Sequence, residues 1–168
     1  MAQQQGVTVR RASVGDAEKV AMFVNRAWRG RAIVDRRAVL ERLGSVGFLL
    51  AERDGELVGM LGWQVENLVV RVFDFLVWPA YEGAAAGRAL FASMEQAAKE
   101  LQCEVALLFL PRSVPLQTVE FCKTLGYTPQ VVASLPRAWR EAAYEGRLGD
   151  DDKVFIKKLR ADRVLRPI

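Results

Sequence analysis

Two apolar segments joined by one helical stretch constrain the fold of this chain more than any other feature. Residues 68–78 and 105–110 are almost entirely apolar or aromatic, a pattern typical of strands that are covered on both faces. Between them, apolar residues recur at helical spacing, which predicts a helix that connects the two strands. The residues of this apolar stripe are Leu90, Phe91, Met94, Ala97, Ala98 and Leu101. We therefore expect a β-α-β unit in the middle of the chain.

The segments before this unit predict a strand, two helices and a hairpin. Ser13 and Asp16 form a capping box that opens the first helix. The pair Asp54-Gly55 is a favoured hairpin turn between two runs of strand-like residues. The expected strands lie at residues 7–11, 47–53 and 57–66, and the expected helices at residues 17–28 and 34–43. Residues 1–6 are expected to be disordered.

The segments after the unit predict one more helix and two strands. Ser113 caps the helix and Gly126 ends it, and the strands are expected at residues 127–133 and 153–159. Residues 134–152 show no clear period and are expected to be irregular. The order β-α-α-β-β-β-α-β-α-β-β predicts one α+β domain with a mixed sheet over residues 1–168.

The composition excludes several classes of site and partner. The chain has no histidine, so a His-based triad and a His-ligated zinc are excluded, and we expect no metal. The net charge of +4 comes from scattered arginines without interleaved aromatic residues, so no nucleic-acid partner is expected. No apolar run reaches the ~20 residues that cross a bilayer, so no membrane partner is expected. Two cysteines are too few for a disulfide framework, and the N-terminal residues lack the features of a secretory signal, which together favour the cytoplasm.

Two sequence motifs carry a family resemblance. Residues 77–90 read Val-Trp-Pro-Ala-Tyr-Glu-Gly-Ala-Ala-Ala-Gly-Arg-Ala-Leu, and residues 121–127 read Phe-Cys-Lys-Thr-Leu-Gly-Tyr. The first resembles the acyl-CoA motif of the GNAT N-acetyltransferase superfamily, in which a strand ends in Val-x-Pro and Arg/Gln-x-x-Gly-x-Gly/Ala enters a helix. The second resembles the family segment Phe-Tyr-x-x-x-Gly-Phe. With a similar opening at Arg10-x-Ala12 and a similar last strand, the resemblance spans nearly the whole chain.

This resemblance implies a GNAT-like fold that binds acetyl-CoA as a co-substrate. A helix N-terminus surrounded by small residues suits a pyrophosphate, because its N–H groups and partial positive charge face the anion. The strand end before it is expected to hold the pantetheine arm, and the N–H of Val77 is expected to polarise the thioester carbonyl. The implied cofactor-binding residues are Phe75, Leu76, Val77, Glu82, Gly83, Ala84, Ala85, Ala86, Gly87 and Arg88.

Three residues depart from the family pattern. Glu82 stands where the family has arginine or glutamine; its carboxylate repels a phosphate, caps the helix in place of the phosphate, or points out to solvent. Ala85 replaces a glycine, which strains the backbone if a positive φ is required and is harmless if the loop is already helical. Cys122 replaces a tyrosine that protonates the departing thiolate, and it is either a weak acid or a small core residue.

The resemblance implies transfer of an acetyl group to a primary amine. Glu66 and Asp74 are the candidate bases. An apolar strand around Asp74 favours a carboxyl group that takes up a proton; the alternative is a carboxylate paired with Arg71 or another arginine. Glu66 lies near a turn and suits a solvated strand end. The expected catalytic residues are Asp74, Val77 and Cys122. We expect a small-molecule or peptide amine as acceptor, and a homodimer by resemblance. The alternative function is an inactive GNAT-fold binding or scaffold protein with a degenerate CoA site.

Overall fold

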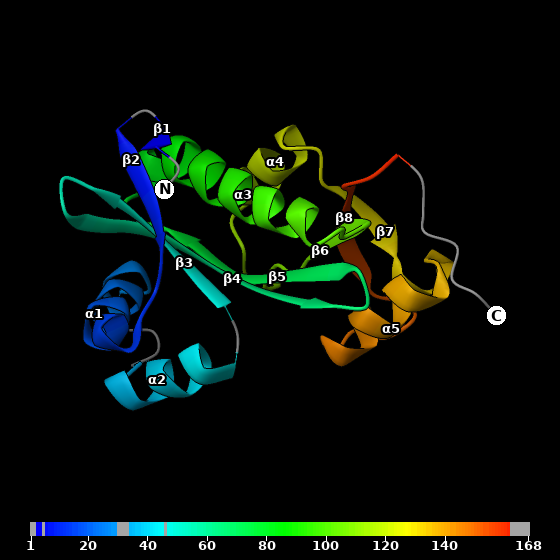
Figure 1. Ribbon diagram of the computed structural model, residues 1–168, viewed down its shortest axis with the longest axis horizontal. Helices are drawn as coiled ribbons and strands as arrows, with labels where there is room; N and C mark the ends of the chain where they lie inside the picture. The colour runs from blue at the N-terminus through cyan, green and yellow to red at the C-terminus, as the bar shows by residue number, and fades with distance from the viewer. Residues whose placement is uncertain (1–2, 5, 30–33, 46, 162–168) are drawn as a thin grey trace. The chain divides into compact units, whose positions relative to one another are not determined.

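The computed structural model describes residues 3–4, 6–29, 34–45 and 47–161 of the chain (Figure 1). The chain divides into two compact units, each of which is described by itself. The first unit comprises Met1–Trp63 and Asp74–Met94, and the second comprises Gln64–Phe73 and Glu95–Ile168. Strands β4 (Glu56–Glu66) and β5 (Val69–Val77) and helix α3 (Gly83–Glu100) contribute residues to both units.

The first unit combines antiparallel strands with helices. Its strands are hydrogen-bonded in the order β1-β2-β3-β4-β5, and β1, β2, β3 and β4 pair antiparallel. The turn between β3 and β4 has positive φ at both Asp54 (52°) and Gly55 (79°), as the predicted hairpin requires. The remaining elements of this unit are β1 (Gln3–Gln4), β2 (Val7–Arg11), η1 (Val14–Asp16), α1 (Ala17–Ala27), α2 (Arg36–Ser45), β3 (Gly47–Arg53) and η2 (Ala80–Glu82).

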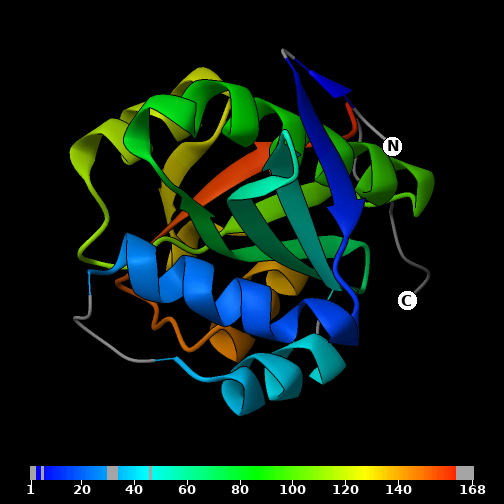
Figure 2. The same cartoon turned by 90° about the vertical axis from the view of Figure 1, so that its left-hand side faces the viewer.

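The core of the first unit explains how α3 is placed on its strands. In Figure 2, α1 and α2 lie along one face of β3 and β4, and α1 residues Val20, Phe23 and Val24 share a core cluster with Met60 of β4. Gly59 points the other way, because successive strand residues face opposite sides. A Cβ added at Gly59 would lie 3.0 Å from the Leu90 side chain of α3. The glycine therefore lets α3 pack closely against β4.

The second unit contains the rest of the predicted β-α-β unit. Strand β5 pairs parallel with β6 (Val105–Leu108), from Val69↔Val105 to Val72↔Leu108, which confirms the predicted parallel pair. The strand order continues β6-β8-β7 with antiparallel pairing. The other elements of this unit are α4 (Leu116–Thr124), β7 (Thr128–Val131), η3 (Val132–Ser134), α5 (Arg137–Glu145) and β8 (Lys153–Lys158). The observed order confirms the predicted α+β class.

Helix α5 corrects the expectation that residues 134–152 are irregular. Trp139, Ala142 and Ala143 are buried on one side of this helix and join the core formed with β6 and β8. Arg137 and Glu141 form an i,i+4 ion pair at 3.0 Å on its exposed side. Pro136 precedes the helix as its N-cap residue. Only nine residues long, the helix offers one short apolar stripe, which is why its period was missed.

Several expectations concern the termini and the domain count. Residues 1, 2 and 5 lie outside the described residues, whereas Gln3–Gln4 pair with Thr8 and Val7 of β2. The capping box of Ser13 and Asp16 is present, and it opens η1 directly before α1.

A single domain over residues 1–168 stays a prediction. Within the described ranges, no helix has both the length and the apolar character needed to span a membrane.

Candidate acyl-CoA site

Strand β5 ends in the segment that was predicted to hold the pantetheine arm. Its ladder to β6 ends at Val72, whose carbonyl accepts from the N–H of Phe109, while β5 itself continues to Val77. The ring of Phe75 packs edge-on against Phe91 of α3 at 4.9 Å, and Leu76 packs against the core cluster under α1. Val77 is half-buried. The strand end is thus fixed through the side chains of Phe75 and Leu76.

Helical backbone begins before the predicted phosphate cradle. The N–H of Glu82 donates to the Pro79 carbonyl at 3.0 Å, and that of Gly83 donates to the Ala80 carbonyl. Gly83 has φ −53° and ψ −48°, and Ala85 lies in the first turns of α3 without a positive φ. Alanine is therefore unstrained at position 85, as expected for the alternative in which this loop is already helical. A Cβ at Gly83 would meet no atom within 4 Å, so the start of α3 is open on that side.

The other cradle residues differ in exposure. Ala84 and Arg88 are exposed on α3, whereas Ala86 and Gly87 are buried in the helix interface. The guanidinium of Arg88 therefore lies at the surface and the buried pair serves packing. The assignment of all these residues to a cofactor stays a prediction.

Glu82 is neither a helix cap nor a solvent-exposed carboxylate. Its side chain is 10% exposed, and the Nε–H of Arg53 at the end of β3 donates to both carboxylate oxygens at 3.0 and 2.9 Å. In the described part of the chain, no α3 amide donates to this carboxylate. The expected repulsion between Glu82 and a phosphate is therefore reduced, because the pair carries no net charge.

Asp74 lies on β5 at a position of irregular backbone, and its carboxylate forms an ion pair with Arg42 of α2. Its φ of 54° lies in the left-handed region, which residues other than glycine seldom adopt. The Nε and Nη2 groups of Arg42 both donate to Oδ2 of Asp74, at 2.9 and 2.7 Å. Within the described residues, Oδ1 accepts no hydrogen bond, and the side chain is 32% exposed. Of the two alternatives for Asp74, the structure therefore shows the carboxylate paired with an arginine.

The partner of Asp74 is Arg42 and not Arg71. Arg71 has only 13% of its side chain exposed and donates to Oε1 of Gln64 at 2.9 Å. It also lies 3.6 Å from a carboxylate oxygen of Glu145 and 4.0 Å from one of Glu66. Glu66, the second candidate base, is exposed at the end of β4. Its position suits a surface charge.

Cys122 is a fully buried residue of α4. Burial raises the pKa of its thiol to about 11. It lies in the same unit as Tyr127, which is buried too and donates from its hydroxyl to Glu95 at 3.2 Å. The burial of Cys122 matches the core alternative. Because of this high pKa, the thiol keeps its proton at neutral pH. A role of Cys122 as an acid stays a prediction.

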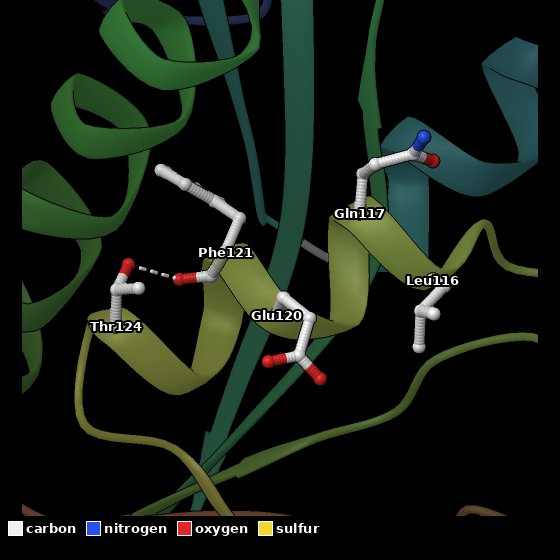
Figure 3. Close-up of a pocket in the computed structure, with 5 residues that line it drawn as sticks. All are labelled: Leu116, Gln117, Glu120, Phe121 and Thr124. Carbon is white, nitrogen blue, oxygen red and sulfur yellow. Dashed lines mark hydrogen bonds between the residues drawn. The ribbon is translucent and has the colours of Figure 1, made fainter.

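The exposed side of α4 carries a separate surface hollow of about 480 Å³ (Figure 3). Its lining residues all come from this helix: Leu116, Gln117, Glu120, Phe121 and Thr124. None of them was a predicted site residue. Among the described residues, no cluster of three or more acidic or cysteine side chains is arranged to hold a metal ion.

Sequence reasoning missed Arg42 and Arg53. Both arginines lie far along the chain from their partners, at separations of 32 residues for Arg42 and 29 for Arg53. Neither belongs to a motif, and a scattered arginine in a sequence resembles a surface charge. Only the paired strands and the packed helices bring them to Asp74 and Glu82.

A family model decides the classification. The model described as the acetyltransferase (GNAT) family matches residues 14–127, which is more than half of the chain and includes both motifs. The chain belongs to the GNAT acetyltransferase family. The prediction of a GNAT-type acyltransferase is thereby confirmed at the level of the family. Among curated proteins, no sequence matches this GNAT chain.

Solved structures share the fold of this GNAT protein at low sequence identity. An acetyltransferase of the GNAT family from Staphylococcus aureus Mu50 has a TM-score of 0.70 at 16% identity, over 92% of this chain and 99% of its own. The PaiA N-acetyltransferase of Thermoplasma acidophilum, in complex with coenzyme A, has a TM-score of 0.67 at 14% identity, over 90% and 98%. YncA of Salmonella typhimurium, with its cofactor acetyl-CoA, has a TM-score of 0.63 at 17% identity, over 95% and 98%.

Proposed function

We propose that this GNAT protein transfers the acetyl group of acetyl-CoA to a primary amine by direct attack. The observation that carries the proposal is the match of the family model across both motifs, where Val77-x-Pro79 leads into the start of α3. Two structures with the same fold contain coenzyme A or acetyl-CoA. The open space at Gly83 supports a site for the pyrophosphate at the N-terminus of this helix.

The reaction needs a neutral amine and a stabilised oxyanion. The acceptor ammonium first loses a proton; its lone pair then attacks the thioester carbonyl carbon, the C–S bond breaks, and coenzyme A leaves as a thiolate that takes up a proton. We assign the polarisation of the carbonyl to the N–H of Val77. One donor aimed at the oxyanion is worth about 3 kcal/mol in acyl transfer. Phe75 and Leu76 fix the strand that carries this N–H.

Asp74 is the proposed base or proton relay. Arg42 holds Oδ2, which leaves Oδ1 to accept a proton from the ammonium or from an intervening water. Backbone irregularities of the kind found at Asp74 cluster at functional sites. Cys122 enters the proposal as a weak acid at most, since burial keeps its thiol protonated and the CoA thiolate leaves without a dedicated acid.

The proposed acceptor is a small-molecule or peptide amine. The proposed assembly is a homodimer, which sedimentation at micromolar concentration would test. A cytoplasmic location, favoured because two cysteines are too few for a disulfide framework, stays a prediction.

The test begins with the binding of acetyl-CoA and coenzyme A by isothermal titration calorimetry. We expect micromolar binding of both, followed by thiol release in a screen of primary amines. Asp74→Asn should lower kcat by about 100-fold or more while acetyl-CoA binding is unchanged. Glu41→Gln, which removes a charge on α2 that is 72% exposed, is the matched control. Absence of cofactor binding by the unmodified protein would overturn the proposed function and favour the inactive scaffold.

A further inference from the structure

The start of α3 carries a buried carboxylate where a phosphate is proposed to bind. Glu82 is the residue directly before Gly83, and its side chain is 10% exposed. A buried negative charge at this place opposes an anionic ligand, because the low local dielectric strengthens the repulsion between like charges. The chain must therefore neutralise Glu82 if the proposed site is to bind a pyrophosphate.

Arg53 supplies the opposite charge from another part of the chain. It is the last residue of β3, directly before the hairpin turn at Asp54-Gly55, and its side chain is 31% exposed. Its Nε–H lies 3.0 and 2.9 Å from the two oxygens of Glu82. The pair joins the β3–β4 hairpin to η2, just before α3.

The guanidinium of Arg53 also lies close to the backbone at Gly6. Gly6 has φ +82°, and a Cβ added there would lie 2.9 Å from Nη1 of Arg53. The absence of a side chain at Gly6 thus gives the guanidinium its space. Glu82 thus anchors the guanidinium, and Gly6 leaves the space that it occupies.

We propose that Arg53 is a positioning residue for acetyl-CoA, which neutralises Glu82 and so removes the repulsion between this carboxylate and the pyrophosphate. This inference rests on the proposed function. In the acyl-CoA motif that the sequence resembles, an arginine or glutamine stands at position 82. Here Glu82 on η2 and Arg53 on β3 form an ion pair without net charge at that place. Glu82 anchors the guanidinium, and Arg53 cancels the charge of Glu82.

The test compares two ligands that differ in their phosphates. Acetyl-CoA carries the pyrophosphate and the nucleotide, whereas acetyl-pantetheine carries the same thioester without either. Arg53→Met should weaken acetyl-CoA binding by roughly 10- to 30-fold, since Glu82 is left as an uncompensated charge. Binding of acetyl-pantetheine, followed by NMR up to millimolar concentration, should be unchanged. A purely structural role of Arg53 would weaken both ligands together.

Two further variants keep the inference testable if Arg53→Met folds poorly. Glu82→Gln should bind acetyl-CoA as tightly as the unmodified protein or more tightly, because the negative charge at position 82 is removed. The double variant Arg53→Met/Glu82→Gln contains no buried unpaired charge and should recover affinity to within about threefold. Arg37→Met is the matched control, because it breaks an ion pair with Glu41 on α2 in which Arg37 is 88% exposed.

The outcomes separate this inference from the proposed function. If the unmodified protein binds no acetyl-CoA, the proposed function fails. If it binds acetyl-CoA but Arg53→Met binds equally well, or weakens both ligands alike, the role of Arg53 is wrong. The role is also wrong if Glu82→Gln alone weakens acetyl-CoA binding selectively, because the carboxylate would then be the group that favours the ligand.

Discussion

At the scale of single residues, the first unit repeatedly pairs a carboxylate with an arginine from a different segment. Asp16 pairs with Arg10, Asp74 with Arg42, and Glu82 with Arg53. The exposed fractions of the three carboxylate side chains differ: 12% for Asp16, 32% for Asp74 and 10% for Glu82. The most exposed of the three is the one proposed to handle a proton. The two buried ones are expected to depend most on their partners.

Asp16→Asn should lower the free energy of unfolding by about 2–3 kcal/mol at neutral pH, less than for a fully buried pair because Arg10 is partly exposed. Asp16 accepts hydrogen bonds from Arg10 at 2.8 and 2.7 Å and from the Ser13 N–H at 2.7 Å. Hydrogen bonds from Arg10 are the main cause that holds the pKa of Asp16 below its ordinary value of 3.8. This stabilisation is present above that value and is lost as the pH falls below it. Urea unfolding should therefore show the difference between variant and unmodified protein shrinking towards acid pH; a constant difference would contradict it.

Cys122 should be unreactive towards thiol reagents in the folded protein. Its thiol is fully buried, and burial raises its pKa to about 11, so little thiolate is present and little of it is accessible. At about pH 8, alkylation followed by peptide mapping should show labelling at least 100-fold slower than in denaturant. Peptide mapping separates Cys122 from Cys103, which is buried as well. Rapid labelling of Cys122 in the folded state would show an accessible thiol and would support its role as an acid.

At the scale of elements, α5 depends on the close approach of its C-terminal end to an aromatic ring. A Cβ added at Gly146 would lie 2.3 Å from Cε1 of Phe109, a distance that forces a shift. Gly146→Ala should therefore destabilise the protein by about 1–3 kcal/mol. Phe109→Leu in the same chain should recover part of that loss, as urea unfolding would measure.

Gly149→Ala is the control for this pair. The Cβ there would meet Asp152 at 3.6 Å, an ordinary contact, and the unfolding midpoint should barely move. If Gly146→Ala is as stable as the unmodified protein, or if Phe109→Leu gives no recovery, the packing of α5 against Phe109 is not what limits this position.

The sequence predicted long elements well and pairings between distant elements poorly. The apolar runs on either side of α3 predicted the two strands β5 and β6, because a strand that is buried on both faces has a continuous run of apolar residues. A nine-residue helix such as α5 leaves too short a pattern. The motif located Glu82 and Ala85, but the partner of Glu82 depends on which arginine the hairpin brings near, and tertiary structure alone determines that. Whether Ala85 is strained likewise depended on where helical backbone begins.

At the scale of the whole molecule, the proposed function predicts that acetyl-CoA stabilises the folded chain. A ligand that binds only the folded state adds RT ln(1 + [L]/Kd), about 2.7 kcal/mol at a concentration 100-fold above Kd. For a chain of 168 residues, that increment corresponds to a rise in Tm of about 5–10 °C. Differential scanning calorimetry over a series of acetyl-CoA concentrations should show this logarithmic rise.

The same measurement on the Arg53 and Glu82 variants links the residue scale to the whole molecule. Arg53→Met should need roughly 10- to 30-fold more acetyl-CoA for the same rise in Tm, since only the dissociation constant enters the logarithm. The double variant Arg53→Met/Glu82→Gln should return close to the original curve, although its unliganded Tm is free to differ. Comparing shifts and not absolute Tm values removes the effect of each substitution on unliganded stability. A double variant that still needs the higher concentration would show that Arg53 does more than cancel the charge of Glu82.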